Sequence, residues 1–203
     1  MKEHESRPQV SSLPAQIRRI VLIGFMGAGK STVGAHLAAR LGWPFEDADR
    51  FIEARAGCSI GALFRRDGEA AFRRLEVESI AALLERSPLV LATGGGALES
   101  PLTREALNRL SDTCIVFLDA PLDVLIARCL EQPGAAERPV LAEREQLEQR
   151  FTGRLPLYRE AHLIVPTLEL EPDALAESIL EELRGRIALT PEAKSAVNEG
   201  TTP

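Results

Sequence analysis

Residues 20–31 of the chain read IVLIGFMGAGKS, and this run determines the class of fold that the rest of the sequence must complete. Its first four residues are all apolar, which is typical of a short strand buried on both faces. Gly24–Ser31 then matches the pattern G-x-x-x-x-G-K-S, and a helical pattern continues to Leu41. A glycine-rich turn without a ligand is the alternative reading. The flanking strand and helix favour a phosphate-binding loop, or P-loop.

The chemistry expected of this loop follows from its residue types. Glycines let successive backbone N–H groups point inward around phosphate oxygens, and the following helix adds its positive end. We expect Lys30 to reach the β- and γ-phosphates of a nucleoside triphosphate, and the Ser31 hydroxyl to bind Mg²⁺. The sequence therefore predicts a protein that binds a nucleoside triphosphate with Mg²⁺ and transfers the terminal phosphoryl group.

Beyond the loop, apolar runs alternate with amphipathic segments. The other predicted strands are 44–46, 89–92, 114–118 and 163–165. The predicted helices are 30–41, 69–86, 122–130, 143–153 and 172–184. Alternating strands and helices predict an α/β fold, in which a parallel sheet carries helices on both faces. We expect a disordered leader at 1–16, a single domain at 17–187 and a flexible tail at 188–203.

Composition excludes several classes of protein. The 203 residues carry a net charge of −6, which disfavours general binding to nucleic acid. The three cysteines, Cys58, Cys114 and Cys129, form no C-x-x-C pair, so we expect neither a disulfide framework nor a zinc site. Without a signal-peptide pattern or a membrane span, the sequence predicts a cytoplasmic protein.

Features outside the P-loop point to the class of protein and to a second substrate. The sequence has no N-K-x-D guanine motif, and its length suits a small-molecule kinase rather than a GTPase or a large ATPase. Asp47 and Asp49 follow the second strand, where carboxyl ends of parallel strands meet ligands. One carboxylate could join the metal shell while the other orients or accepts an acceptor proton. The alternative is an acidic turn that caps the next helix.

Glycines and arginines supply the remaining candidates. Gly94–Gly96 follows the strand at 89–92 and would allow close approach of a ligand, although a flexible loop is the alternative. Arg73, three residues before Glu76, could hold an anionic substrate or form a solvated ion pair. Arg154 is a further cation. Residues 131–145, with two prolines, a glycine and many charges, fit a mobile lid and an inert surface loop equally well.

Taken together, these features resemble the shikimate kinase family from about Ile20 to Leu183. The motifs that carry the resemblance are G-F-M-G-A-G-K-S-T, F-E-D-A-D-R-F-I-E, A-F-R-R-L-E, T-G-G-G-A, E-R-P-V-L and G-R-L-P-L-Y-R. The resemblance implies a P-loop kinase of the nucleoside-monophosphate-kinase type, with a central parallel five-stranded sheet and a lid at about 131–145. It also implies transfer of the γ-phosphoryl of ATP to the 3-hydroxyl of shikimate, in the chorismate branch of aromatic amino-acid biosynthesis.

The resemblance also implies a role for each matching residue. The catalytic residues would be Lys30, Asp49 and Arg138. ATP would be bound by Gly27, Ala28, Gly29, Lys30, Ser31, Thr32, Arg128 and Arg138, with Arg128 near the adenine. Shikimate would be bound by Arg73 and Arg154 through its carboxylate, and by Asp49, Gly94, Gly95 and Gly96 through its hydroxyls. Mg²⁺ would be held by Ser31 and, through water, by Asp47.

The sequence departs from the family pattern in one place. Thr167–Pro172 lacks the basic residue expected beside the adenine, so we expect backbone and apolar contacts there. Phe64 and Phe72 would pack about the substrate-side helices or simply fill the core. The alternatives are another small-molecule P-loop kinase, such as a gluconate kinase, and a nucleotide-binding module without transfer activity. We expect a monomer that binds ATP and shikimate but neither nucleic acid nor membrane.

Overall fold

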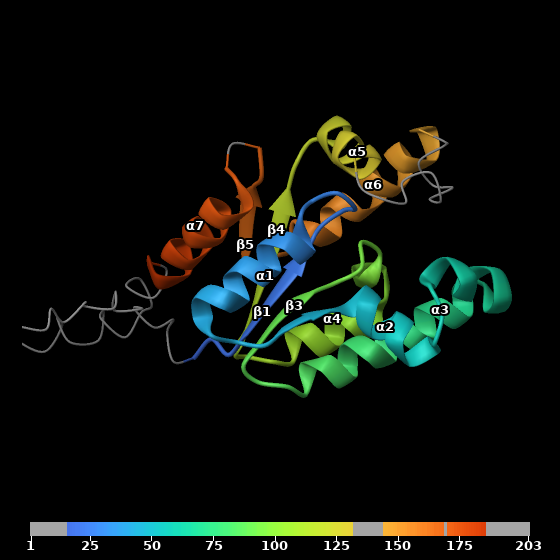
Figure 1. Cartoon of the computed structure of the whole chain (residues 1–203), viewed down its shortest axis with the longest axis horizontal. Helices are drawn as coiled ribbons and strands as arrows, with labels where there is room; N and C mark the ends of the chain where they lie inside the picture. Colours follow the sequence, from blue (N-terminus) through green and yellow to red (C-terminus); the bar gives the residue numbers. More distant parts are fainter. Residues whose placement is uncertain (1–15, 132–143, 169, 186–203) are drawn as a thin grey trace, which may run out of the picture.

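The computed structural model of the chain describes residues 16–131, 144–168 and 170–185 (Figure 1). The predicted leader, tail and lid, including Arg138, lie almost wholly outside these residues. Within them, no helix is long and apolar enough to cross a membrane.

Five parallel strands form the single sheet that the apolar runs predict. The strands are β1 (Arg19–Ile23), β2 (Phe45–Asp47), β3 (Leu89–Ala92), β4 (Thr113–Asp119) and β5 (Leu163–Pro166). Their order is β2-β3-β1-β4-β5, with β1 at the centre. β1, β3 and most of β4 are buried because helices cover both faces, whereas the edge strand β5 alternates buried and exposed residues. The predicted fold class is confirmed.

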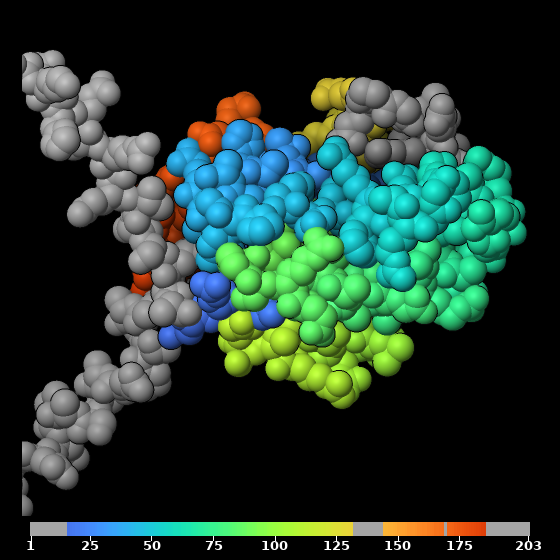
Figure 2. All heavy atoms as spheres, turned by 60° about the horizontal axis from the view of Figure 1, so that its bottom comes forward, coloured from blue at the N-terminus to red at the C-terminus, as the bar shows by residue number. Residues whose placement is uncertain are grey.

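The helices form the outer layers. They are α1 (Lys30–Leu41), α2 (Ala48–Ala56), α3 (Ile60–Leu84), α4 (Pro101–Asn108), α5 (Leu122–Leu130), α6 (Arg144–Tyr158) and α7 (Pro172–Gly185), with a 3₁₀ turn η1 (Ala97–Glu99). α1 packs against α7 on one side of the sheet, and α3 packs against α4 on the other (Figure 1). α2 and α3 lie together at one end of the molecule (Figure 2).

Several helix boundaries differ from the prediction. α2 and α4 were not predicted, and α3 begins at Ile60 rather than at residue 69. The predicted start of α3 instead lies beside Gly68, whose φ of 80° and ψ of 170° interrupt the helix. α6 continues past the predicted end at residue 153, through Pro156, to Tyr158. Burial of Arg154 and Tyr158 accounts for this extension, because tertiary packing overrides the cost of an internal proline.

The strand register brings the site together. Leu22 of β1 is paired with Ala92 of β3, and Ala92 is paired with Asp47 of β2. The P-loop, the start of α2 at Asp47–Asp49 and the Gly94–Gly96 loop therefore leave the sheet at the same level. These segments follow the carboxyl ends of the strands. The order of the strands reverses at β1, which has β3 on one side and β4 on the other. Open α/β sheets bind ligands at the carboxyl ends of the strands beside such a reversal.

Candidate active site

A cleft of about 610 Å³ opens at this edge of the sheet. It brings together most of the sequence-predicted residues: Gly27, Gly29, Lys30, Ser31, Thr32, Asp47, Asp49, Arg73, Gly94, Gly95, Gly96 and Arg154. Ala28, also in the P-loop, is buried and does not line the cleft. Glu53, Glu76, Thr93 and Arg150 also line the cleft but were not predicted as site residues.

The P-loop is held in a shape that only glycine adopts easily. Gly24, Gly27 and Gly29 have φ values of 139°, 76° and 87°. A side chain at Gly27 would also collide with the backbone carbonyl of Leu125. Lys30 Nζ donates to the carbonyl oxygens of Gly24 and Phe25, both at 2.9 Å. Burial lowers the pKa of Lys30 to about 8, against the opposing effect of nearby carboxylates.

The carboxylate of Asp47 accepts three hydrogen bonds, two at one oxygen and one at the other. Its Oδ1 accepts the backbone N–H groups of Asp49 and Arg50 at 3.0 and 3.3 Å, so it caps α2. Its Oδ2 accepts the Ser31 hydroxyl at 2.5 Å. The capping alternative is therefore confirmed, while Oδ2 still faces the P-loop serine. A hydroxyl and a carboxylate oxygen are hard donors of the kind that Mg²⁺ prefers, so these residue types fit that ion.

The carboxyl groups of Asp49 and Glu76 lie against Gly94. A Cβ at Gly94 would be 2.7 Å from Glu76 Oε1 and 2.8 Å from Asp49 Oδ1. Burial and the neighbouring Asp47 raise the pKa of Asp49 to about 6, although Lys30 acts in the opposite direction. Burial also raises the pKa of Glu76, which is only 1% exposed. Gly94 has to be glycine because two acidic side chains fill the space that its Cβ would need.

The raised pKa of Asp49 predicts a pH-dependent stability. The folded chain holds this proton more tightly than the unfolded chain, so the stabilising contribution is complete below about pH 4 and is lost as the pH rises through about 6. Asp49→Asn removes this effect. We expect the stability of the variant relative to the wild type to be about 1 kcal/mol more favourable at pH 8 than at pH 4.

Urea unfolding of both proteins at the two pH values, without nucleotide or metal, measures this difference. Glu78→Gln, which removes an exposed carboxylate of α3, serves as the control and should show no such change. An Asp49→Asn variant with the same relative stability at both pH values would contradict the expectation.

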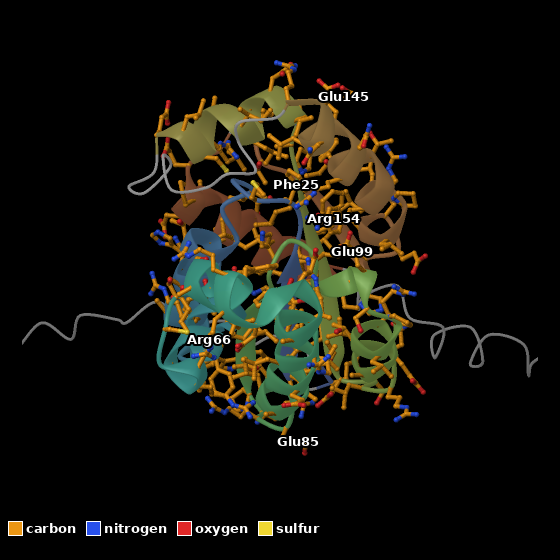
Figure 3. All side chains as sticks on the ribbon, turned by 90° about the vertical axis from the view of Figure 1, so that its right-hand side faces the viewer. Phe25, Arg66, Glu85, Glu99, Glu145 and Arg154 are labelled. Atoms are coloured by element: carbon orange, nitrogen blue, oxygen red, sulfur yellow. The ribbon has the colours of Figure 1, made fainter. Side chains whose placement is uncertain are left out.

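The two predicted substrate arginines meet across the cleft. Arg73 comes from α3 and donates from Nη1 to Glu76 Oε2 at 2.7 Å. Arg154 comes from α6, is 7% exposed, and lies with its guanidinium 5.6 Å from the Phe25 ring centre. Both contact the same oxygen, Glu99 Oε2, at 3.5 Å from Arg73 Nη2 and 3.0 Å from Arg154 Nη2. Figure 3 shows Arg154 between Phe25 and Glu99.

The Gly94–Gly96 loop is fixed by hydrogen bonds and by these side chains. The Tyr158 hydroxyl donates to the carbonyl of Gly95, and the Thr93 hydroxyl donates to the carbonyl of Leu22 at 3.1 Å. A Cβ at Gly96 would be 2.7 Å from both terminal nitrogens of Arg73. The glycines therefore make room for side chains of the protein as well as for a ligand.

Of three other predicted residues, Phe64 and Phe72 line the cleft, whereas Arg128 does not. Arg128 of α5 donates to the Thr167 hydroxyl at 3.0 Å and to the Thr167 carbonyl at 2.6 Å. Arg128 therefore places a cation beside Thr167–Pro172, the segment that has no basic residue of its own. Phe64 and Phe72 stack with ring centres 4.6 Å apart, and Phe72 belongs to a small core with Ile52. Both phenylalanines also line the cleft, so each of their two expected roles has structural support.

A P-loop on a five-stranded parallel sheet, facing carboxylates and paired arginines, defines a small-molecule phosphotransferase. The family model for shikimate kinase matches residues 26–184, and the chain belongs to the shikimate kinase family. The chain is 45% identical over 169 residues to a shikimate kinase of Paramagnetospirillum magneticum, covering 82% of this chain and 84% of that protein.

Solved structures agree with this assignment. A shikimate kinase from Acinetobacter baumannii in complex with shikimate superposes with a TM-score of 0.78 at 37% identity, covering 84% of this chain and 94% of the other. A sugar kinase from Janibacter has a TM-score of 0.58 at 20% identity, covering 81% of this chain and 93% of the other. At that identity the second likeness concerns the fold alone.

Proposed function

We propose that the chain transfers the γ-phosphoryl group of ATP to the 3-hydroxyl of shikimate, giving shikimate 3-phosphate and ADP. The observation that carries this proposal is the convergence of Arg73 and Arg154 in the same cleft as the P-loop. Two guanidinium groups suit a small carboxylate, because arginine can bind it with paired hydrogen bonds. Membership in the shikimate kinase family supports the same acceptor.

On the nucleotide side, the P-loop backbone and Lys30 would hold the phosphates. Lys30 now bonds to carbonyls of its own loop, so its ammonium group is already near the position that phosphate oxygens would occupy. Ser31 and, through water, Asp47 would hold Mg²⁺, which neutralises developing charge on the phosphates. Arg128 would lie near the adenine, and Arg138 would reach the transferring phosphoryl group.

On the acceptor side, Asp49 would receive the shikimate hydroxyl. Its carboxylate lies against Gly94, so a hydroxyl bound there would meet both the carboxylate and the glycine loop. Asp49 would orient this hydroxyl and accept its proton as the new bond to phosphorus forms. The pKa of about 6 leaves the group ionised at neutral pH and able to take that proton.

A monomeric working unit stays a prediction. A cytoplasmic location stays a prediction. The proposed function is tested by ADP release from purified protein with MgATP and shikimate. We expect release that depends on shikimate, and little release with gluconate. Release with gluconate alone would favour the alternative kinase, and release with neither acceptor would leave a binding module.

A further inference from the structure

Glu99 bridges the two arginines that are proposed to bind the substrate carboxylate. It ends η1, three residues after Gly96, and its side chain is 43% exposed. One of its oxygens contacts both Arg154, at 3.0 Å, and Arg73, at 3.5 Å. Within the described part of the chain, these two arginines are its ion-pair partners. The protein thus already holds one carboxylate between the two cations proposed to hold another.

Glu99 differs from the other acidic partners of Arg73. Glu76 is buried on the same helix and bonds to Nη1 at 2.7 Å, so it fixes the guanidinium in place. Glu69 is 62% exposed on the same helix, where it contacts Nη2 at 3.3 Å. Glu99 comes from a different element, and it contacts Arg154 as well. Only Glu99, among these three, bridges the pair.

The surroundings of Glu99 allow its side chain to leave. Its side chain is 43% exposed, so its carboxylate can turn into solvent without burying a charge. Its backbone stays in place, because its N–H donates to the carbonyl of Gly96 at 3.0 Å and its carbonyl accepts from Arg104 Nη1 at 3.1 Å. Partial burial acts to raise the pKa of Glu99, but the hydrogen bond from Arg154 and the charges of Arg154 and Arg73 outweigh it and lower the pKa, so the side chain is an anion at neutral pH.

We propose that Glu99 is an internal counter-ion that occupies the carboxylate subsite in the free enzyme and is displaced when substrate binds. This inference rests on the proposed function, which assigns Arg73 and Arg154 to the shikimate carboxylate. Glu99 neutralises two neighbouring cations while the cleft is empty. Binding of shikimate then breaks two ion pairs as it forms its own, so Glu99 weakens affinity for substrate without entering the reaction.

The test replaces Glu99 and measures shikimate binding and turnover separately. For Glu99→Gln we expect the Kd and KM for shikimate to fall about three- to fivefold, as removal of a partly exposed ionic competitor implies, with kcat little changed. Glu99→Ala should lower the Kd and KM as well. It removes the carboxylate without leaving the amide by which glutamine could still bond to the arginines. Calorimetry gives the Kd and ADP release gives KM and kcat.

Glu69→Gln is the matched control, because it removes an exposed carboxylate that contacts Arg73 alone, and it should leave Kd unchanged. If Glu99 instead holds the arginines ready for substrate, Kd will rise in both Glu99 variants, and that result overturns the inference. Unchanged Kd in folded variants also overturns it. Wild-type protein that neither binds nor phosphorylates shikimate would instead refute the proposed function.

Discussion

Lys30→Ala should lower kcat by about 10³-fold or more while the Kd for shikimate changes little. The lysine is the cation of the P-loop, and its ammonium group would stabilise charge that develops on the transferring phosphoryl group. The contacts proposed for shikimate come instead from α2, α3, α6 and the Gly94–Gly96 loop. Coupled ADP release measures kcat, and calorimetry with shikimate alone measures the Kd for shikimate.

Two results would contradict this expectation. Turnover near the wild-type rate would overturn the P-loop assignment, and loss of shikimate binding in a folded variant would show that Lys30 also shapes the acceptor site. Lys30→Arg is the matched variant, because it retains the charge on a bulkier group. We expect it to remain strongly impaired, since the lysine sits within bonding distance of two loop carbonyls.

Arg73→Ala should raise the Kd for shikimate about 30-fold, which corresponds to the ~2 kcal/mol expected for one side of a charge-assisted pair. The variant also leaves Glu76 buried without its closest partner, and this should lower stability. Arg73→Lys separates the two effects, because it keeps a cation for Glu76 but loses the planar fork that matches a carboxylate. Both variants should weaken binding, but only the alanine variant should be markedly destabilised.

Arg66→Ala is the control on the same helix. Arg66 is 60% exposed and pairs with Asp67, away from Glu76 and Glu99. We expect its substitution to leave the Kd and KM for shikimate unchanged. An unchanged KM for Arg73→Ala, measured in parallel with the same MgATP concentration, would contradict the placement of the substrate carboxylate.

The sheet was predictable because its strands are short apolar runs that the chain buries on both faces. The same local signal failed for α2, whose sequence ADRFIEARA mixes charged and apolar residues and follows β2 without a loop. It failed again for the first half of α3, where Gly68 interrupts the helical pattern. These segments are stabilised by contact with each other, through Ile52, Leu63 and Phe72, which no local pattern reveals.

Sequence motifs identified most of the residues that line the cleft but not their contacts with one another, and the roles of these residues stay predictions. Asp47 was expected either to join the metal shell or to cap a helix, and the structure uses its two oxygens separately. Glu99 was missed because it stands in a short turn with no motif of its own. Its position three residues after the glycines was the one available signal, and only the fold brings it between arginines from α3 and α6.

Leu22, Ala92 and Asp47 are in register across β1, β3 and β2. This register limits where residues can be inserted into or deleted from the chain. One residue inserted in or deleted from β3 would turn every following side chain to the opposite face and move the glycine loop away from Asp49 and Arg73. A change of the same size in the connections at the opposite edge of the sheet would leave these pairings intact. Length differences among functional variants should therefore accumulate at that far edge, and a scan of single-residue insertions would map the tolerant positions.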